Sequence, residues 1–388
     1  MRAINQTLGK KQGIYLDNNA TTPIHPEVAQ AFKKSLSIFG NPSSIHYAGR
    51  QAYEALENAR DSVASLLGVA SDTLIFTSSG TEANNHVLQA LIQPHATTQK
   101  PHIITSAIEH SSVKETCRFL ERIGAATVSR IPVDTQGVID LEALEKSITP
   151  ETKLIFIMTA NNEVGTIQPQ ADIVKIAQKH GILCGTDAVQ AVGKIPLNAE
   201  ELGVDFLTLS SHKLYAPKGS GALYIKPGVS LYPLIYGGAH ERRLRGGTQN
   251  VPGIIALGKA AQLLKEHDQT EVQKLTTQFT EGVFSSIPDV FLNGHPELRI
   301  PGTVNLSFKG VSGEALLMNL DQLGIAVSTG SACSTGSIEP SSVLQAMEVP
   351  EDLIQCAVRF SIGQFNTHEE IEHVLKLLPT LVQKLRIP

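Results

Sequence analysis

The chain has 388 residues, of which 41% are hydrophobic, and this length and composition are typical of a globular protein with about two to three domains. Its formal net charge is −5, and its lysines and arginines are scattered, which argues against stable binding to DNA or RNA. No apolar run is as long as a membrane span, and the first residues lack the apolar centre of a signal peptide, so we expect a cytoplasmic protein that does not bind membranes.

From about residue 50 onward, helical patterns alternate with short apolar runs. The helical patterns cover 53–68 and 81–92, and the apolar runs cover 73–78, 102–108, 153–160, 182–188 and 205–210. This alternation is typical of βαβ units, in which helices cover a parallel sheet. We therefore predict an α/β fold with a mostly parallel sheet.

The pattern changes after residue 253. A long helical stretch over 254–287 leads into apolar runs such as 303–308 and 357–362, and an amphipathic helix follows at the end of the chain. We interpret this part as a smaller α+β domain. The expected division is a large domain over 14–255 and a small domain over 256–388, together with residues 1–13.

Polar residues gather in the loops that follow the apolar runs. In an open α/β sheet, ligands bind outside the carboxyl ends of the strands. We therefore expect five loops to converge on one pocket: SSGTE (78–82), IEH (108–110), NNEVG (161–165), DAVQ (187–190) and SSHK (210–213).

The four cysteines are too few for a disulfide framework in a chain of this length, and their spacing does not match a zinc site. Cys117 lies in a helical pattern, while Cys184 and Cys356 lie in apolar runs, where cysteine behaves as a small hydrophobic residue. Cys333 differs, because it lies among small, flexible residues in GSACSTGSIEPS (330–341). This loop is suited to moving a nucleophile.

Lys213 and Asp187 are the first candidates for binding a cofactor. Pyridoxal phosphate needs a lysine that forms a Schiff base and an acid that keeps the pyridine nitrogen protonated. Both residues follow predicted strands, and an ion pair would hold the acid ionised. The alternative for either residue is a solvated loop position. Together with Cys333, the pair suggests sulfur chemistry on an amino acid.

The SSGTE loop is the candidate phosphate site. Gly80 and Thr81 open a predicted helix, and the backbone N–H groups of a helix start bind anions. Ser210, His212 and Thr248 can add further donors. The alternative is that the serine or threonine of SSGTE only caps the helix.

Four more residues complete the candidate set. His110 presents a flat ring that can stack on a cofactor and exchange a proton near neutral pH. Asn162 and Gln190 can reach a ring oxygen of the cofactor, although amides in turns are often local caps. Arg359 can bind a substrate carboxylate with its planar guanidinium, or it can be a surface charge beside an edge strand.

Together these segments resemble the pyridoxal phosphate-dependent cysteine desulfurases of the NifS and IscS type, within the class V aminotransferase family. The resemblance runs almost from end to end. Nine segments occur in the family's order: YLDNNATTPIHPEV, GNPSSIHYAGR, IFTSSGTEANN, NNEVG, DAVQAVGK, SSHKLYAPKGSGALY, RLRGGTQN, GSACSTGSIEPS and VRFSIGQFN.

The resemblance implies a fold-type I homodimer with a mostly parallel seven-stranded sheet. It implies that Lys213 carries pyridoxal 5′-phosphate and removes the α-proton, that Asp187 pairs with the pyridine nitrogen, and that His110 stacks on the ring. The other implied roles are ring contacts for Asn162 and Gln190, phosphate contacts for Gly80, Thr81, Ser210, His212 and the partner subunit's Thr248, and binding of the cysteine carboxylate by Arg359, with Asn162 also near the substrate.

The implied reaction gives L-alanine and a persulfide on Cys333, whose thiolate attacks the sulfur of L-cysteine. The expected acceptor is an iron–sulfur scaffold protein of the IscU or NifU type, and Cys333 can also serve as a transient ligand of a forming cluster. Glycine at position 80, where many members have alanine, and RGGT in place of RSGT are small exchanges that we expect to leave the phosphate site intact. Since the sequence stops at Pro388, just after the last predicted helix, where many members continue into a docking tail, the acceptor stays open.

Two alternatives remain at this stage. The same cofactor residues would serve an aminotransferase or a selenocysteine lyase, neither of which requires a cysteine that takes up sulfur. A docking protein without catalysis would need none of Lys213, Asp187 and Cys333.

Overall fold

The computed structural model describes residues 13–90, 100–329 and 340–386, which form two compact units. Unit 1 comprises Met1–Ala20, Glu163–Gly165 and Gln269–Pro388, and unit 2 comprises Thr21–Asn162 and Thr166–Asp268. Within the described ranges, every helix is too short or too polar to cross a bilayer.

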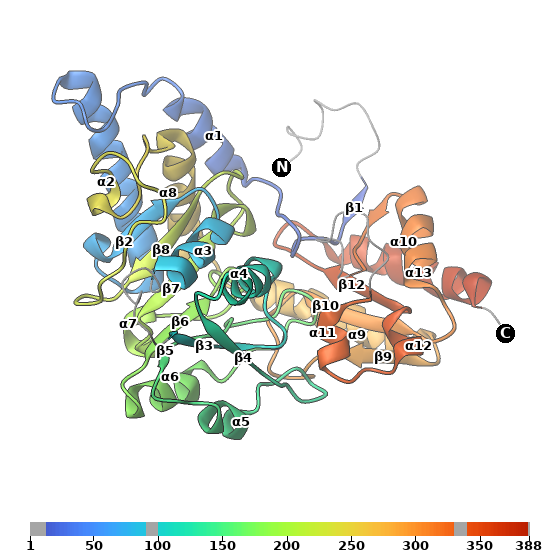
Figure 1. Ribbon diagram of the computed structural model, residues 1–388. Coiled ribbons are helices and arrows are strands. Elements are labelled where there is room, and N and C mark those ends of the chain that lie inside the picture. Colours follow the sequence, from blue (N-terminus) through green and yellow to red (C-terminus); the bar gives the residue numbers. More distant parts are fainter. Residues whose placement is uncertain (1–12, 91–99, 330–339, 387–388) are drawn as a thin grey trace. The chain divides into compact units, whose positions relative to one another are not determined.

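Unit 2 is built on a seven-stranded sheet (Figure 1). Strand β8 runs antiparallel to both of its neighbours, and the other adjacent pairs are parallel, which confirms the predicted mostly parallel sheet. In spatial order the strands are β2 (Leu74–Thr77), β8 (Gly221–Ile225), β7 (Phe206–Ser210), β6 (Leu183–Asp187), β5 (Thr152–Phe156), β3 (His102–Ser106) and β4 (Thr127–Ile131).

Helices cover this sheet because their apolar residues recur every three or four positions. In α4 (Ser111–Arg122), Val113, Cys117 and Leu120 are buried and share a core with Phe156 and Phe206 of the sheet. Helix α3 (Gly80–Ala90) belongs to the same core. The other helices of the unit are α1 (Pro26–Ser35), α2 (Tyr47–Leu67), α5 (Leu141–Lys146), α6 (Gln170–Lys179), α7 (Ala199–Leu202) and α8 (Val251–Glu266).

The helical stretch expected over 254–287 is two helices in the structure. Helix α8 ends at Glu266, and α9 (Thr270–Ser286) begins after a break. His267 adopts an extended conformation (φ −88°, ψ 129°) in a polar stretch between Leu264 and Val272, the buried residues on either side. Because the residues of this break have no apolar face to bury, packing against the core does not stabilise a helix there.

Unit 1 contains two small sheets. Strands β12 (Ala357–Ser361), β10 (Thr303–Phe308) and β9 (Val290–Asn293) form an antiparallel sheet, and β1 (Ile14–Tyr15) pairs with β11 (Ile325–Ala326) in parallel. Besides α9, its helices are α10 (Gly313–Gln322), α11 (Ser342–Ala346), α12 (Glu351–Ile354) and α13 (His368–Leu385). Thr367 and Glu370 form a capping box at the start of α13, the predicted final helix.

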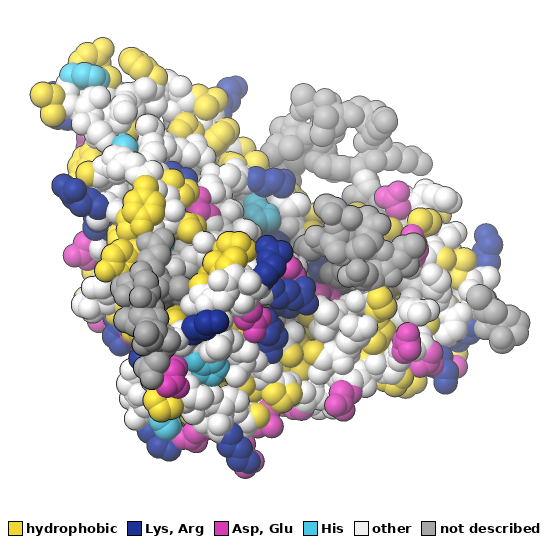
Figure 2. All heavy atoms as spheres, viewed as in Figure 1, with side chains coloured by type: hydrophobic (Ala, Val, Ile, Leu, Met, Phe, Trp, Pro, Cys, Tyr) yellow, Lys and Arg dark blue, Asp and Glu magenta, His cyan; other side chains and the backbone are white. Residues whose placement is uncertain are grey.

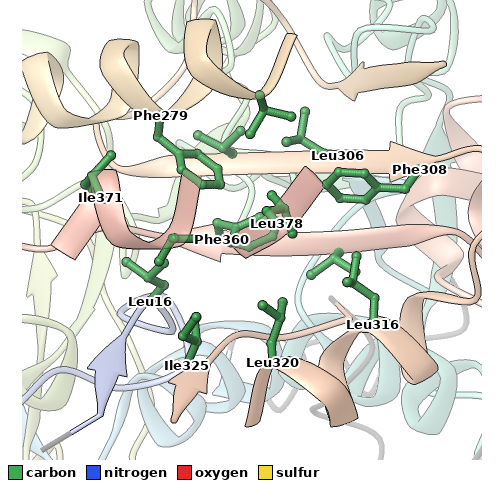
Figure 3. Packing of buried hydrophobic residues seen from close by; sticks show 14 of the residues in the cluster. Leu16, Phe279, Leu306, Phe308, Leu316, Leu320, Ile325, Phe360, Ile371 and Leu378 are labelled. Carbon is green, nitrogen blue, oxygen red and sulfur yellow. The ribbon is translucent and has the colours of Figure 1, made fainter. Parts of the chain in front are cut away.

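Aromatic rings fill the core of unit 1. Figure 3 shows Phe279 of α9 beside Phe360 of β12, with ring centroids 4.8 Å apart, and Phe308 of β10 is 6.4 Å from Phe360 in an edge-on arrangement. Leu16 and Leu320 lie in the same cluster and are fully buried. The core therefore joins residues from both ends of the chain.

The two units differ at their borders from the expected domains. Residues 14–20 belong to unit 1, because β1 pairs with β11 and Asn18 bonds to Ser361. Residues 256–268 belong to unit 2, because α8 packs against α1 and α2. The segment Glu163–Gly165 belongs to unit 1, where the backbone N–H of Ile300 donates to the carbonyl of Gly165 at 3.0 Å.

Candidate active site

The loops singled out in the sequence follow strands β2, β3, β5, β6 and β7. These five strands are parallel to one another, so their carboxyl ends lie at the same edge of the sheet of unit 2. The NNEVG loop is divided, since Asn161 and Asn162 belong to unit 2 and Glu163–Gly165 to unit 1. The site described below is the part that lies within unit 2.

Asp187 is the last residue of β6, and its side chain is buried. The backbone N–H of Val189 donates to Asp187 Oδ1 at 3.0 Å, and Asn84 Nδ2 of α3 donates to Oδ2 at 2.7 Å. Both carboxylate oxygens are therefore held by the protein. The alternative considered from the sequence, a solvated loop position, is therefore wrong for Asp187.

His110 precedes α4 and is half-buried. Its Nδ1 accepts from the backbone N–H of Ser112 at 3.1 Å and lies 2.7 Å from Ser112 Oγ. Burial lowers the pKa of His110, the charge of Asp187 opposes this shift, and Lys213 and Lys114 add to it. The His110 ring therefore lies close enough to Asp187 and Lys213 for the charges of both to act on its pKa.

Lys213 ends a single 3₁₀ turn, Ser211–Lys213, that directly follows β7. Ser211 anchors this turn, because its hydroxyl donates to the carbonyl of Pro217 and accepts from Ser220 Oγ at 3.0 Å. The Lys213 side chain is half-buried, and Tyr215, two residues later, has a positive φ of 59°. The lysine therefore stands at the end of a buried strand, on a turn fixed by hydrogen bonds.

His212 lies between Ser211 and Lys213. Burial lowers the pKa of His212 to about 4, and the positive charges of Lys213 and Lys218 contribute. The Thr22 hydroxyl and backbone N–H both donate to the carbonyl of His212, at 2.9 and 3.0 Å. His212 is therefore a neutral hydrogen-bonding group at neutral pH.

Helix α3 begins at Gly80, beside Val189 and Ser210. A Cβ atom at Gly80 would lie 2.7 Å from Val189 Cγ2 and 3.4 Å from Ser210 Cβ, so the backbone of Gly80 lies close to these two side chains. Thr81 is exposed. An alanine at position 80 would therefore need the Val189 side chain to move.

Ser79 caps α3, since its Oγ accepts from the backbone N–H of Glu82 at 3.1 Å, so the capping alternative is correct for this serine. The Glu82 carboxylate accepts from the backbone N–H of Ser78 at 2.9 Å and pairs with Arg245 at 3.0 Å. Burial would raise the pKa of Glu82, but the bonds from Arg245 and Ser78 outweigh it and hold the pKa below its usual value.

The remaining predicted site residues are placed as follows. Gln190 is buried, and its Oε1 accepts from Lys194 Nζ at 2.7 Å. Asn162 is half-buried, and Thr248 is exposed. Cys333 lies outside the described residues.

Arg359 belongs to unit 1. It lies on β12, an edge strand as considered from the sequence, but its side chain is only 2% exposed and pairs with Asp17 at 2.8 Å. The surface charge considered as an alternative is therefore wrong.

Sequence reasoning missed three polar residues of the site. Asn84 and Ser112 are buried and bond to Asp187 and His110, as given above. Glu109 is also buried, and its carboxylate accepts from the Ser106 hydroxyl and from the backbone N–H of Met158 at 3.0 Å. The sequence did contain a signal that Asn84 is buried. Asn84 lies three residues before Val87 and four before Leu88, a spacing that places all three on the same buried face of a helix.

The donor set fits pyridoxal 5′-phosphate. Lys213 offers an amine, Asp187 a buried carboxylate for a ring nitrogen, and His110 a flat neutral ring, and the three are near enough for their charges to interact. The start of α3 at Gly80 offers the backbone N–H groups of a helix N-terminus, which are suited to binding an anion.

Comparison with known families agrees with this chemistry. The sequence pattern named Aminotransferase class-V matches residues 14–374. The cysteine desulfurase IscS of Dictyoglomus turgidum is 47% identical over 97% of this chain and 96% of its own length. Cysteine desulfurase 2 of Trichormus variabilis is 47% identical over 96% of this chain and 94% of its own length.

Solved structures are similar over the same range. A protein described as NifS-like superposes with a TM-score of 0.90 at 38% identity, covering 96% of this chain and all of that one. A structure described as SspA in complex with cysteine superposes with a TM-score of 0.82 at 34% identity, covering 91% of this chain and 100% of that one.

Proposed function

The chain belongs to the class-V aminotransferase family, and from this premise we propose that it is a pyridoxal 5′-phosphate-dependent cysteine desulfurase, a sulfurtransferase that converts L-cysteine to L-alanine. The observation that carries the proposal is the cluster of Asp187, His110 and Lys213 in unit 2, whose charges interact. It occurs in a chain that is nearly half identical to named cysteine desulfurases over almost its whole length.

When bound, the cofactor supplies an electron-withdrawing ring that stabilises negative charge on the α-carbon of an amino acid. Lys213 would hold it covalently, Asp187 would pair with the ring nitrogen, and His110 would lie on the ring face. Asn162 and Gln190 are proposed for the remaining ring contacts. The proposed phosphate donors are Gly80, Thr81, Ser210, His212 and the partner subunit's Thr248.

Arg359 is proposed to bind the carboxylate of L-cysteine, with Asn162 also near the substrate. A guanidinium recognises a carboxylate through two parallel N–H donors. In unit 1, Nη2 of Arg359 donates to Asp17 Oδ1, and this hydrogen bond holds the orientation of the arginine side chain. Lys213 Nζ, as the neutral amine, then takes the α-proton of the substrate.

Cys333 is the proposed sulfur acceptor of the enzyme. Its thiolate attacks Sγ of L-cysteine, a new S–S bond forms, and the Cβ–Sγ bond breaks. The electron pair of the broken bond stays with the carbon skeleton, which takes up a proton and leaves as L-alanine. Cys117 and Cys184 are unsuited to this step, because burial raises the pKa of both thiols to about 12.

We also propose that the protein is a homodimer. Unit 2 exposes large apolar side chains along α1, α2 and the segment between them, and Figure 2 shows apolar side chains gathered over this region. Exposed contiguous apolar surface is typical of protein interfaces. The residues of this apolar patch are Leu36, Phe39, Ile45, Tyr47 and Tyr53.

The persulfide sulfur is proposed to pass to an iron–sulfur scaffold protein of the IscU or NifU type. The names of the IscS relatives support this assignment, and Cys333 can ligate a forming cluster transiently. A thiolate nucleophile must stay reduced, so we propose the cytoplasm as the compartment.

The function is tested by incubating the cofactor-loaded protein with L-cysteine and a reductant and measuring alanine and sulfide. We expect equal amounts of both from the wild type, and loss of both in Cys333→Ala, with cofactor binding retained. Cys356→Ala, which removes a buried thiol that donates to the carbonyl of Asp352, is the matched control and should keep its activity.

Three results would replace the proposal. Full activity in Cys333→Ala would indicate a lyase that needs no persulfide, and release of selenide from L-selenocysteine alone would make it a selenocysteine lyase. A keto acid as the product would indicate an aminotransferase.

A further inference from the structure

We propose that Asn84 is a positioning residue of the active site, whose amide orients the Asp187 carboxylate and, through Ser112, the His110 ring. The inference deepens the proposed function and rests on it, since Asp187 and His110 are assigned there to the cofactor. The contacts that carry it lie entirely within unit 2.

Asn84 lies on α3 and is only 1% exposed. Both hydrogens of its amide nitrogen are used, one toward Asp187 Oδ2 at 2.7 Å and one toward Ser112 Oγ at 2.9 Å. Its Oδ1 accepts from Thr208 Oγ1 of β7 at 2.7 Å. Since an ionised carboxylate can only accept, these three partners determine which end of the amide is the nitrogen.

Asn84 also holds the Ser112 hydroxyl beside His110. Ser112 Oγ accepts from Asn84 Nδ2 and lies 2.7 Å from His110 Nδ1, to which it can donate its own hydrogen. The backbone N–H of Ser112 donates to the same nitrogen. His110 Nδ1 is therefore an acceptor, and the neutral ring carries its proton on Nε2.

The same amide acts on Asp187. The Val189 N–H and Asn84 Nδ2 hold one carboxylate oxygen each, which fixes the plane of the group. Without Asn84, Oδ2 loses a charge-assisted hydrogen bond, and the carboxylate is free to rotate about its Cβ–Cγ bond. Asn84 thus connects the group proposed for the ring nitrogen with the ring proposed to stack on the cofactor.

The ring of His110 is surrounded by charges, which makes its ionisation a sensitive readout. Asp187 favours the protonated ring, and Lys213 and Lys114 oppose it. Burial lowers the pKa of His110 further, so the ring is neutral in the working enzyme. Loss of Asn84 leaves the Ser112 hydroxyl free to turn away from His110 Nδ1, and a ring that loses this donor is protonated more easily.

The test compares the cofactor-loaded Asn84→Leu variant with the wild type by visible absorption between pH 5.5 and 9. We expect the midpoint of the pH-dependent absorption change to shift by about one pH unit, and cofactor affinity to fall roughly tenfold, as for loss of one hydrogen bond to a charged group. For alanine formation, kcat should fall by a similar factor, while KM for L-cysteine stays unchanged.

Asn293→Ala is the matched control. Asn293 is a buried amide in the sheet of unit 1, and its Nδ2 donates to Asn305 Oδ1 and Ser307 Oγ, both at 2.8 Å. It should lower Tm but leave the absorption midpoint and the cofactor affinity unchanged. If Asn84→Leu behaves like this control, its role is only structural and the inference is overturned.

Ser112→Ala and Thr208→Val keep the inference testable if Asn84→Leu does not fold. Each removes one side-chain partner of Asn84, Ser112 Oγ in the first variant and Thr208 Oγ1 in the second. Each should shift the absorption midpoint in the same direction as Asn84→Leu, by a smaller amount. Unchanged midpoints in both would overturn the inference. The spectra need no sulfur transfer, so a wild type that releases no alanine would contradict the proposed function, while a shifted midpoint would still support the role of Asn84.

Discussion

Two carboxyl groups at the same edge of the sheet, Asp187 and Glu109, have different surroundings. Asp187 is held by Asn84 and Val189. Burial raises the pKa of Glu109 to about 8, and the nearby charge of Asp187 adds to this shift. At neutral pH Glu109 is therefore mostly protonated, so Asp187 is the carboxylate available to a protonated ring nitrogen.

This difference predicts how stability depends on pH. Between the ordinary carboxyl pKa and about 8, the folded protein keeps the proton of Glu109 while the unfolded chain releases it, so this residue makes stability fall as pH rises. The slope is at most roughly 1.4 kcal/mol per pH unit. In Glu109→Gln this contribution should be absent, and urea unfolding at pH 5.5 and 7.5 measures it.

The control for this prediction is Glu115→Gln, which changes an exposed carboxylate paired with Arg118. Its unfolding free energy should follow the pH dependence of the wild type. A Glu109→Gln variant that shows the wild-type slope would mean that Glu109 is ionised in the folded protein.

Among the elements, the turn before Thr248 has an unusual backbone. Glu241, Arg242 and Arg243 have φ angles of 43°, 56° and 69°, a region that costs about 1 to 2 kcal/mol for each residue with a side chain. The buried Glu241 carboxylate offsets this cost, because Arg60 of α2 donates to its two oxygens at 2.8 and 3.0 Å, and the N–H of Phe76 donates at 2.8 Å.

Breaking the buried ion pair between Arg60 and Glu241 should lower the stability of the folded protein. We expect Glu241→Gln to lower the free energy of unfolding by about 3 kcal/mol, because the buried Arg60 would lose its buried carboxylate partner and keep only the partly exposed Glu57. Urea unfolding provides the measurement, and loss of the exposed partner in Glu115→Gln should cost less than about 1 kcal/mol. Equal effects of the two substitutions would show that the turn does not depend on the pair.

At the scale of the whole molecule, the apolar patch of unit 2 exposes large side chains to solvent. Phe39 is 81% exposed and Ile45 is 91% exposed, although both are residues that usually bury their side chains. A second copy that covers them would remove this surface from water, which is the main driving force for association.

We therefore expect Phe39→Asp with Ile45→Asp to shift the protein from dimer to monomer, as measured by sedimentation velocity across a concentration series. Phe284→Asp, on α9 in unit 1, changes a side chain that is 45% exposed and should leave the oligomeric state unchanged. A wild type that sediments as a monomer at every concentration would contradict the dimer proposal.

Much of the fold was predictable because its signals are local. Strands β2, β3, β5, β6 and β7 are apolar runs buried along most of their length, and their spacing indicated the parallel sheet. The break after Glu266 was missed, because residues on both sides of it have helical patterns. Likewise, the three residues Glu163–Gly165 join unit 1 through contacts with Ile300, Asn305 and Ser341 far along the chain.

By itself, the sequence determined which residue types follow which strands, because the period of apolar residues and the positions of loops are properties of neighbouring residues. This was sufficient to name Lys213, Asp187 and His110 as candidates. The tertiary structure alone decided that Asn84 holds Asp187 across 103 positions and that Arg359 is buried against Asp17 across 342 positions. Such pairs depend on how distant elements pack, and a local pattern carries no information about that packing.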